Sequence, residues 1–127
     1  CLYPLQKFDS DTERRFAVIL ERDAIKWFKP AKGQFQIFYK LGTEQPEYIP
    51  DFVVETDGFI LMAETKAKDE LKSADVVAKA DAAVQWCKHA SDYAASVGGK
   101  PWKYLLVPHD GVSESKRLVD YLQYQQA

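Results

Sequence analysis

Two acidic residues and a lysine stand at the ends of two neighbouring strand-like segments. Asp51 opens the segment 51–56. Glu64 and Lys66 close the segment 59–66. Carboxylate oxygens are the ligands that hard divalent cations prefer, so the group predicts hydrolysis assisted by Mg²⁺, with Mn²⁺ able to replace it. Lys66 would then orient or deprotonate a water molecule, or stabilise negative charge, and the sequence leaves these roles open.

The register of a predicted hairpin brings these residues together. The two segments are joined by Asp57-Gly58, a dipeptide typical of a two-residue hairpin turn. Counting outward from that turn, Asp51 faces Glu64, although like charges at opposed positions destabilise a sheet. Side chains alternate along a strand, so Lys66 projects to the same side as Glu64. An acid followed by an E-x-K triplet also arises by chance, and the placement in the hairpin is what favours a functional site.

The elements before the hairpin are a helix and a strand. Ser10 and Glu13 have the spacing of a capping box, and the apolar stripe that follows predicts a helix over residues 11–28, which Pro30 ends. The aromatic and β-branched run over residues 35–41 predicts the first strand. One helix and one strand are therefore expected ahead of the two hairpin strands.

The elements after the hairpin are a long helix, a strand and a closing helix. Small and apolar residues recur at helical spacing over residues 71–97, and a glycine pair ends the pattern. Residues 102–107 read as a buried strand and residues 113–125 as a helix. A strand, a long helix and a strand imply a right-handed crossover onto one sheet. We therefore expect an α/β fold of order αβββαβα, with a mixed sheet flanked by helices.

Composition limits the class of protein. The 127 residues, 46% of them hydrophobic, suffice for one domain spanning residues 1–127. We expect a cytoplasmic protein without a membrane span, because no apolar run is long enough and Cys1 and Cys87 are too few for a disulfide framework. The formal net charge of -2 argues against strong sequence-independent, electrostatic binding of nucleic acid. Since the chain begins at Cys1 rather than Met, we expect a segment of a longer protein.

A family resemblance rests on two short runs, YIPDFVV at residues 48–54 and AETK at residues 63–66. Together they resemble the signature of the PD-(D/E)xK nuclease superfamily. More narrowly, the chain is similar to the C-terminal endonuclease domain of the cleavage (Res) subunits of type III restriction enzymes. The similarity spans roughly Phe8 to Val107 and includes the run WFKP at residues 27–30. The resemblance implies a restriction-endonuclease-like αβββαβ core, which matches the order expected above.

The resemblance also implies a role for each site residue. Asp51 and Glu64 would ligate the metal, with the backbone carbonyl of Thr65 as a third ligand, and Lys66 would be the catalytic lysine. Members of the superfamily often carry an acid in the first helix, and Glu13 matches that position as a metal ligand. Helix capping alone also explains Glu13, but its alignment with the apolar stripe favours a side chain that leans toward the sheet.

Further partners follow from the resemblance. It implies an endonuclease that cuts double-stranded DNA, coupled to an ATP-driven, helicase-like motor in the same parent chain and to a methyltransferase subunit that reads the target sequence. No P-loop occurs in residues 1–127, so any use of ATP would belong to the rest of the parent. Two alternatives stay open. One is another superfamily nuclease, such as a resolvase or repair nuclease, and the other is a non-catalytic module that binds DNA or docks a partner.

Four other residues are weaker candidates. Lys79 and Gln85 on the predicted long helix could approach DNA, but ordinary solvent-facing positions are the favoured interpretation. His89 and His109 have no companion ligands nearby in the sequence and are predicted to be surface or loop residues. Ala67 departs from the family, in which Gly often follows the lysine, and this departure bears on the turn rather than on the chemistry.

Overall fold

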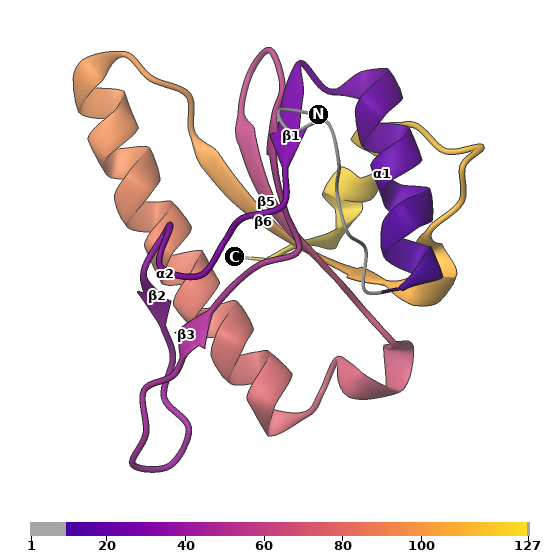
Figure 1. The fold of residues 1–127 in the computed structure, drawn as a ribbon. Coiled ribbons are helices and arrows are strands. Elements are labelled where there is room, and N and C mark those ends of the chain that lie inside the picture. The colour runs from indigo at the N-terminus through magenta and orange to yellow at the C-terminus, as the bar shows by residue number, and fades with distance from the viewer. Residues whose placement is uncertain (1–9, 127) are drawn as a thin grey trace.

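A five-stranded sheet separates two layers of helix in the computed structural model, which describes residues 10–126 (Figure 1). Its strands are Lys26–Phe28 (β1), Phe52–Glu55 (β4), Ile60–Lys66 (β5), Trp102–Pro108 (β6) and Gln125–Gln126 (β7), in the order β1-β4-β5-β6-β7. The β5–β6 pair is parallel and the other pairs are antiparallel. Helix α1, Asp11–Asp23, packs on one face and helix α2, Ala74–Val97, on the other. The expected α/β fold with a mixed sheet flanked by helices is confirmed.

The hairpin register is also confirmed. Strands β4 and β5 pair from Phe52 opposite Ala63 to Glu55 opposite Ile60. The turn is closed by a hydrogen bond of 2.9 Å from the backbone N–H of Thr56 to the Phe59 carbonyl. A two-residue turn and the alternation of a strand leave one register that buries the apolar side chains, and this register places Asp51 at the level of Glu64.

The first helix is shorter than predicted. It ends at Asp23 rather than near residue 28, because Ala24 adopts an extended conformation. The following residues form β1, in which Trp27 pairs with Val54 of β4 and is 3% exposed. A tryptophan in line with a helical stripe fits a strand equally well when its neighbours are exposed, and pairing with β4 satisfies the backbone there.

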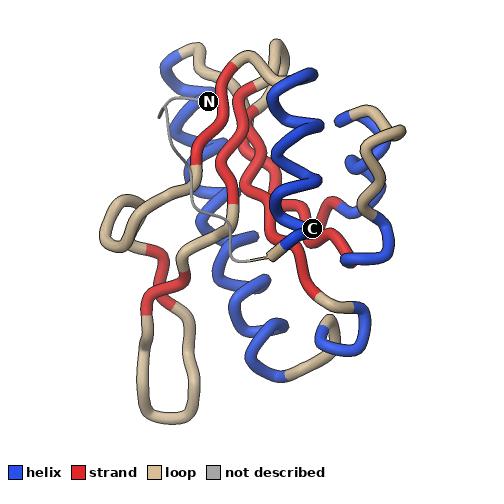
Figure 2. The backbone as a smooth tube through the Cα atoms, turned by 45° about the vertical axis from the view of Figure 1, so that its right-hand side comes forward, coloured by secondary structure: helices blue, strands red, loops and turns tan. Residues whose placement is uncertain are grey.

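The strand predicted over residues 35–41 is wrong in extent and place. Its extended part is Ile37–Phe38 (β2), which pairs with Glu47–Tyr48 (β3) in a separate two-stranded sheet. Gln36 has a φ of 55°, which breaks the extended run before β2. Figures 1 and 2 show this small sheet beside α2, outside the main sheet. The first strand of the main sheet is therefore β1.

The second half of the chain follows the prediction up to its closing helix. Helix α2 begins after Ser73, whose hydroxyl accepts a hydrogen bond from the backbone N–H of Val76, and ends at Gly98, which has a φ of 75°. The predicted helix over residues 113–125 is instead a 3₁₀ segment, Leu118–Tyr124 (η3), followed by β7. Arg117 is extended, so no α-helix runs through it.

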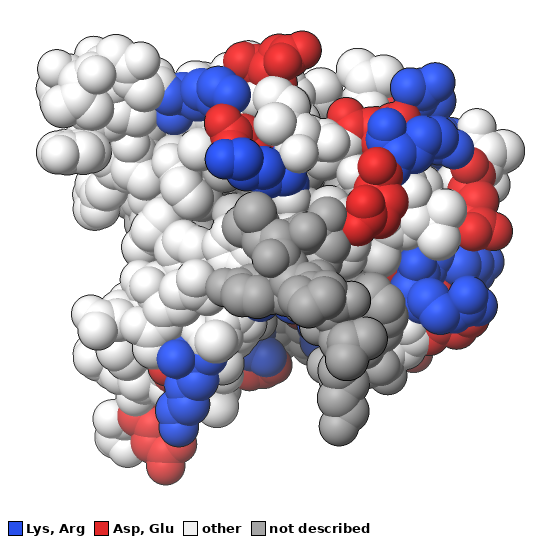
Figure 3. Space-filling model, turned by 45° about the horizontal axis from the view of Figure 1, so that its top comes forward, with Lys and Arg blue, Asp and Glu red and all other residues white. Residues whose placement is uncertain are grey.

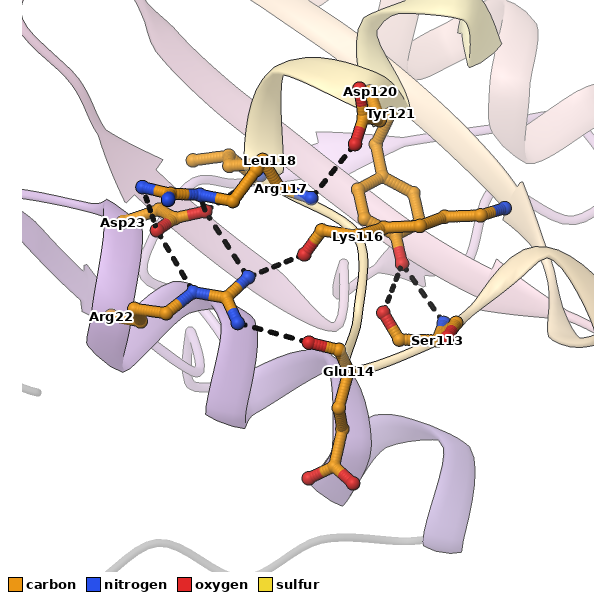
Figure 4. A network of polar contacts seen from close by, with 9 residues as sticks. All are labelled: Arg22, Asp23, Ser113, Glu114, Lys116, Arg117, Leu118, Asp120 and Tyr121. Atoms are coloured by element: carbon orange, nitrogen blue, oxygen red, sulfur yellow. Dashed lines mark hydrogen bonds and ion pairs between the residues drawn. The ribbon is translucent and has the colours of Figure 1, made fainter.

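The segment before η3 is held by Asp23 at the end of α1 (Figure 4). The Asp23 carboxylate accepts hydrogen bonds from the backbone N–H of Leu118 at 2.8 Å and from the Arg117 guanidinium at 3.1 Å. Arg22 donates to the same carboxylate at 3.1 Å. The Asp23 side chain is 6% exposed, and the hydrogen bonds, that from Arg22 foremost, lower its pKa to about 2. A tertiary contact thus decides where this segment begins.

Replacing Asp23 with alanine should lower the free energy of unfolding by about 1.5–3 kcal/mol at pH 7, because it removes charge-assisted hydrogen bonds. The contribution of Asp23 is present above the unfolded pKa near 3.8 and is lost as the pH falls toward 2. Urea unfolding measures the change. Asp11→Ala is the control, since the Asp11 side chain is 63% exposed and water screens its ion pairs, so its loss should be clearly smaller. Equal losses for the two variants would contradict the prediction.

The structure bears on the expected absence of a membrane span and on one of the two cysteines. No helix within residues 10–126 has the length and apolar character needed to cross a membrane. Cys87 is a buried free thiol on α2. Cys1, and Phe8 at the start of the family resemblance, lie outside the described residues.

Candidate active site

The site lies at the end of β5 that extends beyond its antiparallel partner, β4. Strand β4 begins at Phe52, opposite Ala63, whereas β5 continues to Lys66. Beyond Ala63, the side chain of Asp51 takes the place of a strand partner. Its Oδ2 atom accepts a hydrogen bond of 2.9 Å from the backbone N–H of Thr65 and one of 3.1 Å from the Thr65 hydroxyl. The Asp51 carboxylate is therefore fixed against the end of β5.

The backbone carbonyl of Thr65 points to the side of β5 on which the Asp51 carboxylate lies. In a strand, the N–H and the C=O of one residue point to the same side. Since the N–H of Thr65 meets Asp51, its carbonyl also faces Asp51, away from β6. Pro50, which precedes Asp51, has no N–H with which to extend the β4–β5 ladder. A carboxylate and a carbonyl oxygen thus face one space, as a site for a hard cation requires.

Glu64 is held from the other side of the strand. Its side chain is 7% exposed, and its Oε1 atom accepts hydrogen bonds from the Tyr48 hydroxyl at 3.0 Å and from the backbone N–H of Asp51 at 3.1 Å. Its Oε2 atom lies 3.6 Å from the Nζ of Lys66. The predicted proximity of Asp51, Glu64 and Lys66 is present, but the Asp51 side chain turns to Thr65 instead of lying flat beside Glu64.

The electrostatics of the site favour an added cation. Burial foremost, and the charge of the nearby Asp51, raise the pKa of Glu64 to about 8 against the opposing effect of Lys66. Burial is also the main cause that raises the pKa of Asp51. Both carboxyl groups are thus harder to ionise than in water, because too little positive charge faces them. A divalent ion would supply that charge, and its binding would release protons near neutral pH.

Glu13 lies across a small pocket from Asp51. Ser10 caps α1 by accepting a hydrogen bond of 3.1 Å from the backbone N–H of Glu13, as the sequence predicted. The Glu13 carboxylate leans toward the sheet and is paired with the ammonium of Lys29, which also lies 5.0 Å from the ring centre of Phe52. The orientation of the Glu13 side chain toward the sheet is as expected, whereas direct ligation of a metal by Glu13 stays a prediction.

The donor set that fits a metal is small. Within residues 10–126, no three His, Cys, Asp or Glu side chains converge closely enough to hold a metal ion by themselves. The oxygens available are the carboxylates of Asp51 and Glu64 and the carbonyl of Thr65. Mg²⁺ keeps several waters and needs only one or two protein carboxylates, so this set suits Mg²⁺ better than a metal that requires a full protein cage.

The pocket contains two residues that sequence reasoning missed. It has a volume of about 220 Å³, and Asp51 and Lys66 line it together with Glu70 and His109. His109 was expected to be a surface or loop residue, and it is the first residue of the short 3₁₀ turn His109–Gly111 (η2), directly after β6. Parallel strands end at the same edge of a sheet, and Lys66 pairs with Pro108. The parallel β5–β6 pair was the signal that could have placed His109 here.

The remaining candidates lie away from the pocket. Lys79 is paired with Asp75 at 3.0 Å on α2, and Gln85 and His89 are exposed on the same helix. The solvent-facing interpretation therefore holds for Gln85 and His89. Ala67 has a φ of -60° and a ψ of 143°, a conformation open to any residue, so the departure from Gly does not strain the turn.

No protein-family model, no curated protein and no solved structure matches this chain. The class of protein is therefore inferred from the site and from the order of the elements that build it. The structure offers a mixed sheet between helices. At the open end of the hairpin it places a buried carboxylate, that of Glu64, and a half-buried one, that of Asp51, beside a lysine.

Proposed function

We propose that this chain is a metal-dependent nuclease domain of the PD-(D/E)xK type, which hydrolyses phosphodiester bonds in double-stranded DNA. The observation that carries the proposal is the pair of acids at the end of β5. The Glu64 carboxylate accepts a hydrogen bond from the backbone N–H of Asp51, the charge of Asp51 raises the pKa of Glu64, and Lys66 lies beside them. Such a pair costs folding energy unless a cation is bound. The main-sheet elements run α1, β1, β4, β5, α2, β6, the order expected of a restriction-endonuclease-like core, which supports the proposal.

Each site residue has a task in such a reaction. Asp51, Glu64 and the Thr65 carbonyl would hold Mg²⁺, or Mn²⁺ in its place. When bound, the ion supplies Lewis-acid charge and lowers the pKa of a coordinated water. Lys66 carries a positive charge at the rim of the pocket, with a side chain 27% exposed, where it orients the attacking water or stabilises charge on the phosphate. Thr65 and Tyr48 keep the carboxylates in place.

The parent system proposed for this chain is a type III restriction enzyme. The runs at residues 48–54 and 63–66 favour that family over a resolvase or a repair nuclease. A helicase-like motor that uses ATP and a methyltransferase subunit would then provide translocation and sequence recognition. On the face drawn in Figure 3, basic and acidic side chains are interspersed, and the formal net charge is -2. Tight DNA binding is therefore assigned to the rest of the parent.

Titration of the protein with Mn²⁺ in a calorimeter tests the metal site. We expect one ion per chain, and affinity more than about 10-fold weaker in Asp51→Asn, which removes a charged ligand but keeps its shape. Asp57→Asn in the exposed hairpin turn is the matched control and should bind Mn²⁺ as the unmodified chain does. Absence of binding at millimolar Mn²⁺ would contradict the proposal. Binding without any DNA cleavage would favour the non-catalytic module.

A further inference from the structure

We infer that Tyr48 is a positioning residue of the metal site, and that Tyr104 positions Tyr48 in turn. The inference rests on the proposed function. The Tyr48 hydroxyl lies 3.0 Å from Oε1 of Glu64 and 2.9 Å from the Tyr104 hydroxyl, so a continuous chain of hydrogen bonds runs from β6 through β3 to β5. Tyr48 is 3% exposed and Tyr104 is 2% exposed.

The charge of Glu64 decides which hydroxyl group donates each of these hydrogen bonds. A metal-bound Glu64 is ionised and can only accept hydrogen bonds, so Tyr48 donates its proton to Glu64. A tyrosine hydroxyl has a single proton. Tyr104 must therefore donate to Tyr48, which aligns the two hydroxyl dipoles toward the carboxylate. Aligned hydrogen bonds polarise one another, so Tyr104 strengthens the bond that Tyr48 makes.

The two donors on Glu64 determine which of its carboxylate oxygens is left free of them. Tyr48 and the backbone N–H of Asp51 both bond to Oε1, at 3.0 and 3.1 Å. Oε2 is left on the side of Lys66, at 3.6 Å from its ammonium. Rotation of the carboxylate would break both bonds to Oε1. Tyr48 thus presents Oε2 to the cation and fixes the plane of the carboxylate before the cation arrives.

The two-stranded β2–β3 sheet holds Tyr48 in position. Tyr48 lies on β3, opposite Ile37 of β2, and both pack with Val76 of α2 in one buried cluster. Packing alone would be served by phenylalanine, since a buried hydroxyl must recover its lost hydration through hydrogen bonds. The ring of Tyr48 meets that of Tyr104 edge-on, with centroids 6.3 Å apart and planes at 81°. The β2–β3 sheet therefore anchors a hydroxyl group that reaches Glu64.

Mn²⁺ calorimetry on the Tyr48→Phe and Tyr104→Phe variants tests the inference. Tyr48→Phe should weaken Mn²⁺ binding by about 10- to 100-fold, as is usual when a partner of a metal ligand is removed. Tyr104→Phe leaves the Tyr48–Glu64 bond in place and should cost less than about 10-fold. The matched control is Tyr121→Phe. Tyr121 is equally buried and hydrogen-bonded, but its hydroxyl bonds to Ser113 on the α1 face.

The control should bind Mn²⁺ within about twofold of the unmodified chain even where it melts at a lower temperature. A general loosening of the core would weaken Mn²⁺ binding equally in Tyr121→Phe and Tyr48→Phe, and this would overturn the inference. Unchanged affinity in Tyr48→Phe would overturn it as well, while leaving the proposed function intact. Failure of the unmodified chain to bind Mn²⁺ would overturn both.

Discussion

Replacing Lys66 with alanine is expected to slow cleavage of double-stranded DNA by about 10²- to 10⁴-fold, the range for loss of a proton-transfer or charge-stabilising group. The Lys66 ammonium is the cationic group that lies at the pocket rim beside Glu64. Its removal leaves the buried Glu64 carboxylate without that positive charge, so the free energy of unfolding in EDTA should also fall. The rate should be measured under single-turnover conditions, with protein in excess over DNA at low salt, because the acidic chain binds DNA weakly.

Lys68→Ala is the matched control for this prediction. Lys68 is exposed, follows Lys66 by two residues, and carries the same charge without lining the pocket of Asp51. Its loss should reduce binding of DNA modestly and leave the cleavage step almost unchanged. Mn²⁺ affinity measured on Lys66→Ala separates a defect in chemistry from loss of the metal. A Lys66→Ala variant that cuts at the unmodified rate would remove the lysine from the proposed mechanism.

The second large effect is expected on stability. In EDTA, Glu64→Gln should raise the free energy of unfolding by on the order of 2 to 4 kcal/mol at pH 8. The folded pKa of Glu64 is about 8, whereas the ordinary pKa of a glutamate is 4.5. Between these values the folded state holds more protons than the unfolded state, so the unmodified chain loses stability as the pH rises from about 4.5 through 8. The amide oxygen of glutamine still accepts hydrogen bonds from Tyr48 and Asp51, so the variant lacks this loss.

Urea unfolding in EDTA at pH 5 and at pH 8 measures the difference. The two proteins should be close in stability at pH 5 and diverge as the pH rises. Glu55→Gln provides a control of opposite sign, because Lys100 lowers the pKa of Glu55 through a hydrogen bond. Saturating Mg²⁺ should reverse the order at pH 8, since only the unmodified chain gains the full binding energy. A parallel pH dependence in both proteins would show that Glu64 is ionised at no cost.

The hairpin was predictable and the edge elements were not. The Asp57-Gly58 turn and strand alternation specify the β4–β5 register, and therefore the level at which Asp51 meets Glu64, from residues close in the chain. By contrast, the run 25–28 carries both helical and strand signals. Pairing with β4 decides between them, because a strand gains its hydrogen bonds from a partner distant in sequence. The closing segment is likewise decided by the carboxylate of Asp23.

The sequence by itself determined the α/β class and the hairpin that places Asp51 at the level of Glu64, because these depend on helical periodicity, turn chemistry and the alternation of strand side chains, which are local. Only the tertiary structure brought His109 to the pocket and Tyr48 to Glu64. These contacts join β5 to residues on β3 and after β6, and packing across the sheet and against α2 decides which side chains meet. No local spacing in the sequence places Tyr48 at Glu64, since β3 belongs to a separate two-stranded sheet.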